Sequence, residues 1–126
     1  MTEQAERWQT IVFNMVNEEL KDKVIVTELA GDNILIVNDN DNFKDKLFSL
    51  GLEKVGQYYS VSTPVKDVEK RADLIRKLIG IGALFSDGKN WSPSEIVSYY
   101  RDKGLIEGHY IRIAWRNKQD FNITIE

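Results

Sequence analysis

The sequence predicts a single α+β domain that spans residues 1–126. Three observations lead to this fold class. Apolar residues recur at intervals of three and four in several segments, which is typical of amphipathic helices. Short β-branched runs lie between these segments, and the C-terminal part alternates between apolar and polar residues, which is typical of strands. We therefore expect a mixed or antiparallel sheet of about five strands, about four helices and a C-terminal β-hairpin.

The N-terminal half is expected to contain two helices and three strands. In order, these are a helix at 3–22, strands at 24–29 and 34–37 joined by a turn at 30–33, a helix at 43–50, and one strand at 55–61. The first two strands are apolar at successive positions, so we expect them to be central in the sheet or covered on both faces. Gly51 is expected to end the second helix, because glycine readily adopts the left-handed conformation of a helix end.

The C-terminal half is expected to contain two helices and a hairpin. In order, these are a helix that begins at Thr63-Pro64 and is ended by Gly80 and Gly82, a loop from Phe85, a helix at 92–103 that stops at Gly104, and strands at 110–116 and 121–125. On the first of these helices, Val65, Val68, Ala72, Ile75 and Ile79 form one apolar stripe.

The helix at 92–103 has the clearest local signals in the chain. Ser92 is placed to cap its N-terminus, Pro93 stands where a missing N–H is harmless, and Glu95 is placed to close a capping box. Trp91 before the cap and Ile96 inside the helix have the spacing of a hydrophobic staple.

The C-terminal hairpin is predicted to separate an apolar face from a basic one. Ile111, Ile113 and Trp115 alternate with Arg112 and Arg116, so the two groups lie on opposite faces of the strand. Phe121, Ile123 and Ile125 share one face of the partner strand.

The composition excludes several classes of site. The chain has no cysteine, which removes disulfides, thiolate zinc sites and cysteine nucleophiles and fits a reducing cytoplasm. The first residues do not have the pattern of an export signal, and no apolar run approaches the length of a membrane span. We therefore expect a cytoplasmic protein without membrane segments.

Negative charge is concentrated in the first half of the chain, and the formal net charge is −3. Residues 1–63 carry 11 acids and 6 bases, whereas residues 64–126 carry 9 acids and 11 bases. In the acidic segment, residues 28–45, Lys44 is the single base. Two interpretations remain open: a solvated loop with its helix caps, or a surface that attracts a basic partner.

The candidates for catalysis or metal binding lack the required partners. His109 is the only histidine, and no nucleophile-elbow motif accompanies it. Asp39, Asp41 and Asp45 begin like a calcium loop, but the glycine at loop position 6 and the glutamate at position 12 are missing. The glycines near residues 80–88 do not have the spacing of a phosphate-binding loop. We therefore predict no catalytic residue, metal or cofactor.

A nucleic-acid-binding module is the alternative function. The order of helix, capped helix and hairpin is similar to that of a winged helix, and Arg112, Arg116 and Lys118 would supply basic contacts to phosphate. The outward residues of the candidate recognition helix are Ser94, Glu95, Ser98 and Asp102, which do not attract phosphate.

The run ADLIRKLIGIGALFSDGKNWSPSEI, together with the acidic, cysteine-free character of the whole chain, resembles the immunity proteins of bacterial toxin–immunity pairs, such as those of contact-dependent growth inhibition. The resemblance implies a cytoplasmic inhibitor that covers the basic active-site region of a toxin domain, often a nuclease. The resemblance does not assign a functional role to any particular residue of this chain. We expect a basic protein partner, with the acidic segment and two tyrosines as the binding surface. The candidate partner-binding residues are Glu28, Asp32, Asp39, Asp41, Asp45, Tyr58 and Tyr59.

Overall fold

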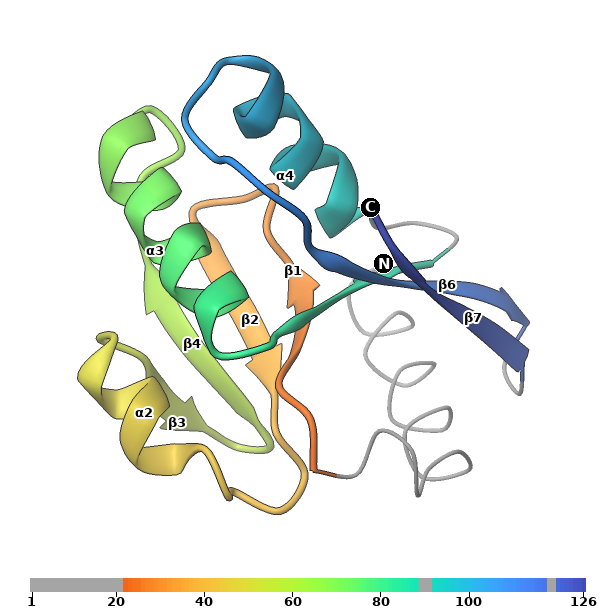
Figure 1. Cartoon of the computed structure of the whole chain (residues 1–126). Helices are drawn as coiled ribbons and strands as arrows, with labels where there is room; N and C mark the ends of the chain where they lie inside the picture. The colour runs from red at the N-terminus through yellow and green to blue at the C-terminus, as the bar shows by residue number, and fades with distance from the viewer. Residues whose placement is uncertain (1–21, 89–91, 118–119) are drawn as a thin grey trace.

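The chain folds around one mixed sheet, and the helices of the described residues pack on one face of it (Figure 1). The computed structural model describes residues 22–88, 92–117 and 120–126. In sheet order, the strands are β3 (Glu53–Val55), β4 (Tyr58–Ser62), β2 (Asn33–Val37), β1 (Ile25–Glu28), β5 (Leu84–Asp87), β6 (Ile111–Asn117) and β7 (Asp120–Ile125). The helices are α2 (Lys44–Ser49), α3 (Val68–Gly80) and α4 (Pro93–Asp102). The predicted α+β class is confirmed.

The sheet is mixed because β5 runs parallel to both of its neighbours, β1 and β6, while every other pair is antiparallel. The β1–β2 hairpin and the C-terminal β6–β7 hairpin are both present as predicted. The central position expected for the first strand is also confirmed, because β1 is the fourth of seven strands and its first three residues are buried.

The predicted count of about five strands is wrong, because the prediction misses two strands. The single strand expected at 55–61 is instead the β3–β4 hairpin, which turns through Gly56 at a φ of 63°. Glycine adopts this left-handed conformation without a steric cost, so it closes a two-residue turn. The loop expected from Phe85 begins as β5, all four residues of which are buried.

The predicted count of about four helices also differs from the three in the described ranges. The helix expected at 3–22 lies almost entirely outside the described residues. The remaining helices are confirmed to within a few residues at their ends. Gly51, Gly82 and Gly104 follow them with φ values of 98°, 85° and 80°, as left-handed helix stops require.

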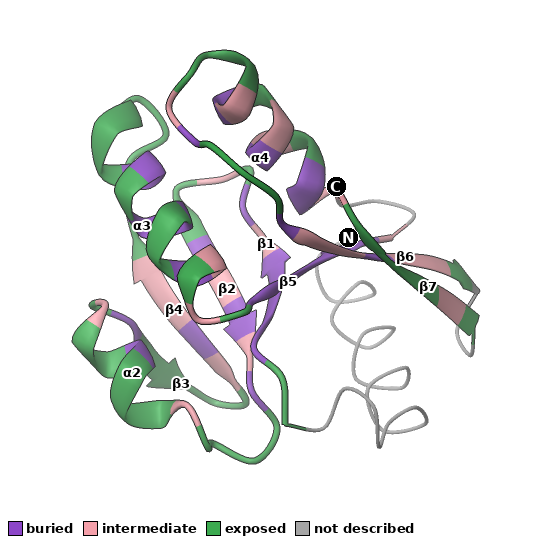
Figure 2. Ribbon diagram, in the orientation of Figure 1, coloured by how far each residue is buried: buried purple, intermediate pink, exposed green. Residues whose placement is uncertain are grey.

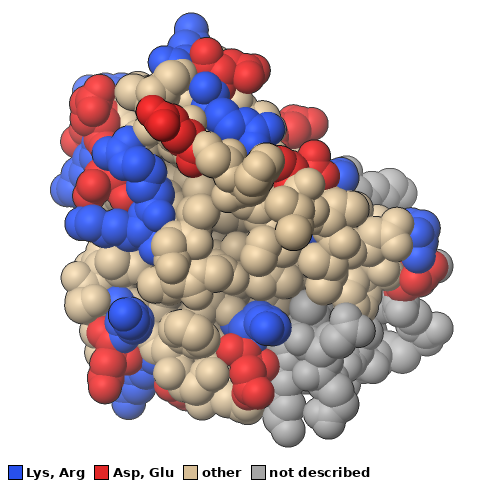
Figure 3. Space-filling model, viewed as in Figure 1, with Lys and Arg blue, Asp and Glu red and all other residues tan. Residues whose placement is uncertain are grey.

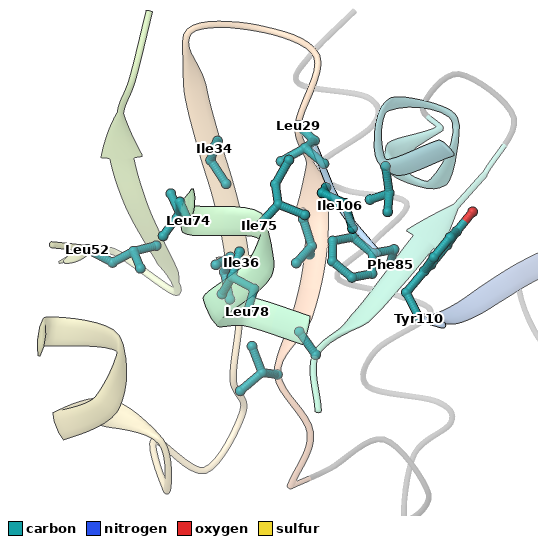
Figure 4. Close-up of a cluster of buried hydrophobic side chains, with 14 of the residues drawn as sticks. Leu29, Ile34, Ile36, Leu52, Leu74, Ile75, Leu78, Phe85, Ile106 and Tyr110 are labelled. Atoms are coloured by element: carbon teal, nitrogen blue, oxygen red, sulfur yellow. The ribbon is translucent and has the colours of Figure 1, made fainter. Parts of the chain in front are cut away.

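The main core lies between the sheet and the helices α3 and α4 (Figures 2 and 4). The helices contribute Ala72, Leu74, Ile75, Leu78, Val97 and Tyr100, which cover Val26, Ile34, Ile36 and Phe85 of the strands. Burial of a side chain of this size stabilises the fold by about 1.5–3 kcal/mol. A smaller cluster on the opposite face contains Ile25, Leu84 and Ile113, with Ile111, Trp115 and Phe121 packed against it. The predicted common face of Ile111, Ile113 and Trp115 is thereby confirmed.

The start of α3 differs from the prediction. The helix begins at Val68, and Asp67 caps it by accepting a hydrogen bond from the Lys70 N–H at 3.3 Å. Thr63 is therefore not the cap, and Val65 and Val68 are exposed at 47% and 39% instead of facing the core.

Arg71 connects α3 to the sheet and is 1% exposed. Its guanidinium donates to the carbonyl oxygens of Thr63, at 2.5 Å, and of Leu29. Within the described residues Arg71 forms no ion pair with a carboxylate. An arginine keeps its charge at any pH at which a protein folds, so these two carbonyl groups stabilise a buried cation.

None of the helices in the described ranges combines the length and the apolar character of a transmembrane span.

Candidate functional site

A groove of about 530 Å³ lies between α4 and β6, beyond the carboxyl end of β5. This position is typical of ligand sites, because the carboxyl ends of parallel strands leave a crevice beside the helix that follows. The volume also lies within the range of about 300–1,000 Å³ that is usual for ligand pockets. On the molecular face that carries α3 and α4, charged side chains gather around the rim and the middle is largely neutral (Figure 3).

Asp87 forms the floor of the groove and joins three elements. It ends β5 and is 8% exposed. One carboxylate oxygen accepts from the Ser94 N–H at 3.0 Å, and the other accepts from the Ser94 hydroxyl and from Arg112 Nε, the latter at 2.6 Å. The hydrogen bond to Asp87 raises the pKa of Arg112 and outweighs burial, which acts to lower it.

The N-terminus of α4 is capped differently from the sequence prediction. Ser92 occupies the N-cap position, but its side chain makes no capping hydrogen bond. Asp87 supplies the acceptor instead, from five residues before Ser92. Trp91, which was predicted to form a hydrophobic staple with Ile96, lies outside the described residues.

The outer face of α4 supplies the acidic wall of the groove. Glu95, Ser98, Tyr99 and Asp102 each lie three or four residues from two of the others, a spacing that places side chains on one helix face. Glu126 adds a carboxylate to those of Glu95 and Asp102. Among the described residues, no basic side chain forms an ion pair with Glu95, Asp102 or Glu126. Tyr99 is 55% exposed, so it is available as an aromatic contact.

Tyr110 fixes the opposite wall. It is 4% exposed, and its hydroxyl lies 2.8 Å from Ser98 Oγ and donates to the Ser94 carbonyl at 3.2 Å. The Arg101 guanidinium lies over its ring, 5.1 Å from the centroid. These contacts hold β6 against α4, so the groove is built from buried, satisfied groups with carboxylates at its rim.

The acidic segment does not form one surface. Glu28 and Asp32 lie at the β1–β2 turn, whereas Asp39, Asp41 and Asp45 follow the other end of β2. A five-residue strand is about 17 Å long, so the two groups are well separated. Asp32 also has a structural contact, because its carboxylate accepts from the Val65 N–H at 2.9 Å.

Tyr59 is a core residue and not an exposed anchor, because it is 0% exposed. Its hydroxyl donates to Asp41, which also receives Lys54 Nζ at 2.6 Å. The hydrogen bond from Lys54, and then that from Tyr59, lower the pKa of Asp41. Tyr58, the other tyrosine predicted as an anchor, is half-buried. Asp39 and Asp45 are exposed, and Glu28 is half-buried.

The cluster of Asp41, Lys54 and Tyr59 predicts a loss of stability at high pH. Burial, and then the bond to Asp41, raise the pKa of Tyr59 from 10.0 to about 12. The folded state therefore holds the phenol proton more tightly, so this contribution is complete below pH 10 and is lost as the pH rises toward 12. Urea unfolding at about pH 8 and pH 11 should show a larger loss in the wild type than in Tyr59→Phe. Equal losses in the two proteins would contradict this prediction.

The basic wing of the alternative function is largely neutralised. Arg112 is paired with Asp87, and Arg116 donates twice to Asp120, at 2.8 and 2.7 Å. Lys118 lies outside the described residues. His109 is exposed, with its Nδ1 3.1 Å from the Glu126 carbonyl oxygen. No group of three or more potential metal ligands occurs in the parts of the chain that the structure describes.

Of the residues predicted to face outward on α4, Glu95 and Asp102 are exposed and Ser98 is half-buried. The prediction is wrong for Ser94, which is buried because it donates to Asp87, and the groove itself was not predicted. Comparisons with protein-family models, with curated proteins and with solved structures found no match for this chain. Evidence for a function therefore comes from the groove itself.

Proposed function

We propose that this chain is a non-enzymatic protein-binding inhibitor, an immunity protein that neutralises a cognate toxin domain by covering its basic active-site region. A nuclease domain is the expected kind of toxin, because an active site that binds phosphates is basic. The observation that carries the proposal is the groove between α4 and β6, whose carboxylates at Glu95, Asp102 and Glu126 form no ion pair with a basic side chain of the described residues. The acidic segment, which is divided between the two ends of β2, is not part of the proposed binding surface.

The groove has the chemistry that a lysine or arginine side chain of a partner requires. The carboxylates attract a cation, and Tyr99, which is 55% exposed, offers an aromatic contact beside them. Carboxylates at the rim of an interface also steer association, which makes the on-rate fast and sensitive to salt. Tyrosine is one of the residues that most often supply binding energy in protein interfaces.

The alternative function, nucleic-acid binding, is not supported by the same groove. Its one lining base, Arg112, is bonded to Asp87, and the carboxylates around it would repel phosphate. Arg116 is held by Asp120 on the hairpin. A protein without a basic field gains little affinity for nucleic acid at physiological salt.

Reversing the charge of the groove tests the proposal. The double variant Glu95→Lys/Asp102→Lys is expected to slow association with the partner at least about tenfold at low salt, because electrostatic steering is lost. Both residues are exposed, so the fold should be retained, which circular dichroism checks. The matched control is Asp39→Lys/Asp45→Lys, which makes the same change of charge at two exposed positions, one in the β2–α2 loop and one in the first turn of α2, and should leave the rate within about twofold.

If the reading frame before this one encodes a large secreted protein, the C-terminal domain of that protein is the toxin domain to test. Co-expression should restore the growth of cells that make this domain, and stopped-flow fluorescence should give the association rates. If the wild type neither binds nor protects, the proposed function is wrong. If the wild type protects but Asp39→Lys/Asp45→Lys associates more slowly than Glu95→Lys/Asp102→Lys, the binding surface lies around Asp39 and Asp45 and the groove is not the site.

A further inference from the structure

The outer edge of β7 is an unprotected sheet edge. No other strand in the described residues pairs with it. Two of its residues, Ile123 and Ile125, are 43% and 74% exposed, and the run from Phe121 to Ile125 contains no proline, lysine or bulge. The opposite edge strand, β3, has three residues and includes Glu53 and Lys54. Short length and charge protect an edge from pairing with another chain, and the run from Phe121 to Ile125 has neither.

The hydrogen-bond pattern shows which backbone groups of β7 are open. The Glu126 N–H donates to the Tyr110 carbonyl at 2.9 Å, so Glu126 is a hydrogen-bonded partner of β6. In an antiparallel pair such residues alternate, so Asn122 and Thr124 also face β6. The N–H and C=O groups of Phe121, Ile123 and Ile125 therefore point away from β6, toward the open edge.

We propose that this edge pairs with β7 of a second copy of the chain, antiparallel and with Ile123 on the two-fold axis. In this register Ile123 lies opposite its own copy and Phe121 lies opposite Ile125. Every outward backbone group then finds a partner, and apolar side chains meet on one face while Asn122 and Thr124 meet on the other. A slip of one residue would place apolar side chains against polar ones, which specifies the register.

The charges at the ends of β7 are compatible with this pairing. Glu126 of one copy lies opposite Asp120 of the other. Asp120 is already bonded twice to Arg116, which lies on the same face of the hairpin. The Glu126 carboxylate therefore meets an Arg116–Asp120 pair and not an isolated negative charge.

The dimer would join two seven-stranded sheets into one, with α4 and its groove on the same face in both copies. A two-fold axis between antiparallel strands preserves the faces of a sheet, so two acidic grooves would open on one side of the assembly. This inference does not depend on the proposed function, because it rests on the edge of β7 alone.

Sedimentation equilibrium of the full chain tests the dimer. One strand pair is a small interface, so we expect a dissociation constant on the order of 10 µM. The average mass should therefore rise with protein concentration toward twice the 14.6 kDa of one chain. Ile125→Lys should raise the dissociation constant at least about tenfold, because lysine blocks edge pairing. Val55→Lys is the matched control, since Val55 is 60% exposed on the opposite edge strand, and it should dimerise like the wild type.

The absence of cysteine allows a second test that does not depend on affinity. In the proposed register the two copies of residue 123 have Cα atoms about 5.5 Å apart, within the range that a disulfide spans. Ile123→Cys should therefore form a covalent dimer under mild oxidation, much faster than Val55→Cys. A wild type that stays monomeric at every concentration, a dimer that survives Ile125→Lys, or equal cross-linking of the two cysteine variants would overturn the proposal.

Discussion

Arg71→Ala is expected to lower the free energy of unfolding by about 4 kcal/mol, the largest effect of any single substitution that we predict. The side chain is 1% exposed and donates to the carbonyl oxygens of Leu29 and Thr63. Its removal leaves a cavity and two buried acceptors without their donor, and each such loss costs about 1–3 kcal/mol. Urea unfolding followed by circular dichroism measures the effect.

Two further variants separate the role of Arg71 from a general effect on α3. Lys70→Ala removes an exposed neighbour on the same helix and should change the stability by less than about 0.5 kcal/mol. Arg71→Lys keeps the charge but cannot reach both carbonyl groups, so its stability should lie between those of the wild type and Arg71→Ala. If Arg71→Ala and Lys70→Ala are equally stable, the guanidinium does not hold the strand ends together.

Asp87→Ala is expected to lower the free energy of unfolding by about 3 kcal/mol. The substitution removes the cap of α4 and the hydrogen bonds that the buried carboxylate accepts from Ser94 and Arg112. A lost cap costs about 1 kcal/mol, and a lost hydrogen bond to a charged group costs about 1.5–3 kcal/mol. Because these contacts also shape the groove, the variant should lose partner binding as well.

Ser92→Ala is the control for Asp87, and it distinguishes the structure from the sequence prediction. Its side chain makes no capping hydrogen bond, so the variant should unfold within about 0.5 kcal/mol of the wild type. A loss of about 1 kcal/mol, with Asp87→Ala close to the wild type, would mean that Ser92 is the cap after all.

Elements defined by local signals could be predicted from the sequence. The helix α4 starts at Pro93 and is followed by Gly104 as expected, and the C-terminal hairpin has the expected apolar face. In each case a few neighbouring residues determine the conformation, through a fixed φ, a left-handed glycine or strict alternation.

Residues whose partners are distant in sequence could not be predicted in the same way. Arg71 bonds to Leu29, which lies 42 positions away, and Asp87 bonds to Arg112, which lies 25 positions away. The strand β5 was missed because it has four residues and no alternation, so burial on both faces is its only distinguishing property. The acidic segment is the opposite case. Its charges are close in sequence and were predicted to form one surface, but they lie at opposite ends of β2.

The three contacts of Asp87 bear on the entropy of binding. One carboxylate fixes the end of β5, the first turn of α4 and the Arg112 side chain, so the two walls of the groove cannot move apart independently. A flexible site loses conformational freedom when it closes around a ligand, and that loss weakens affinity. In this groove, the loss of conformational freedom has already occurred during folding, so the site is preorganised. A partner that inserts a cationic side chain needs to order only that side chain.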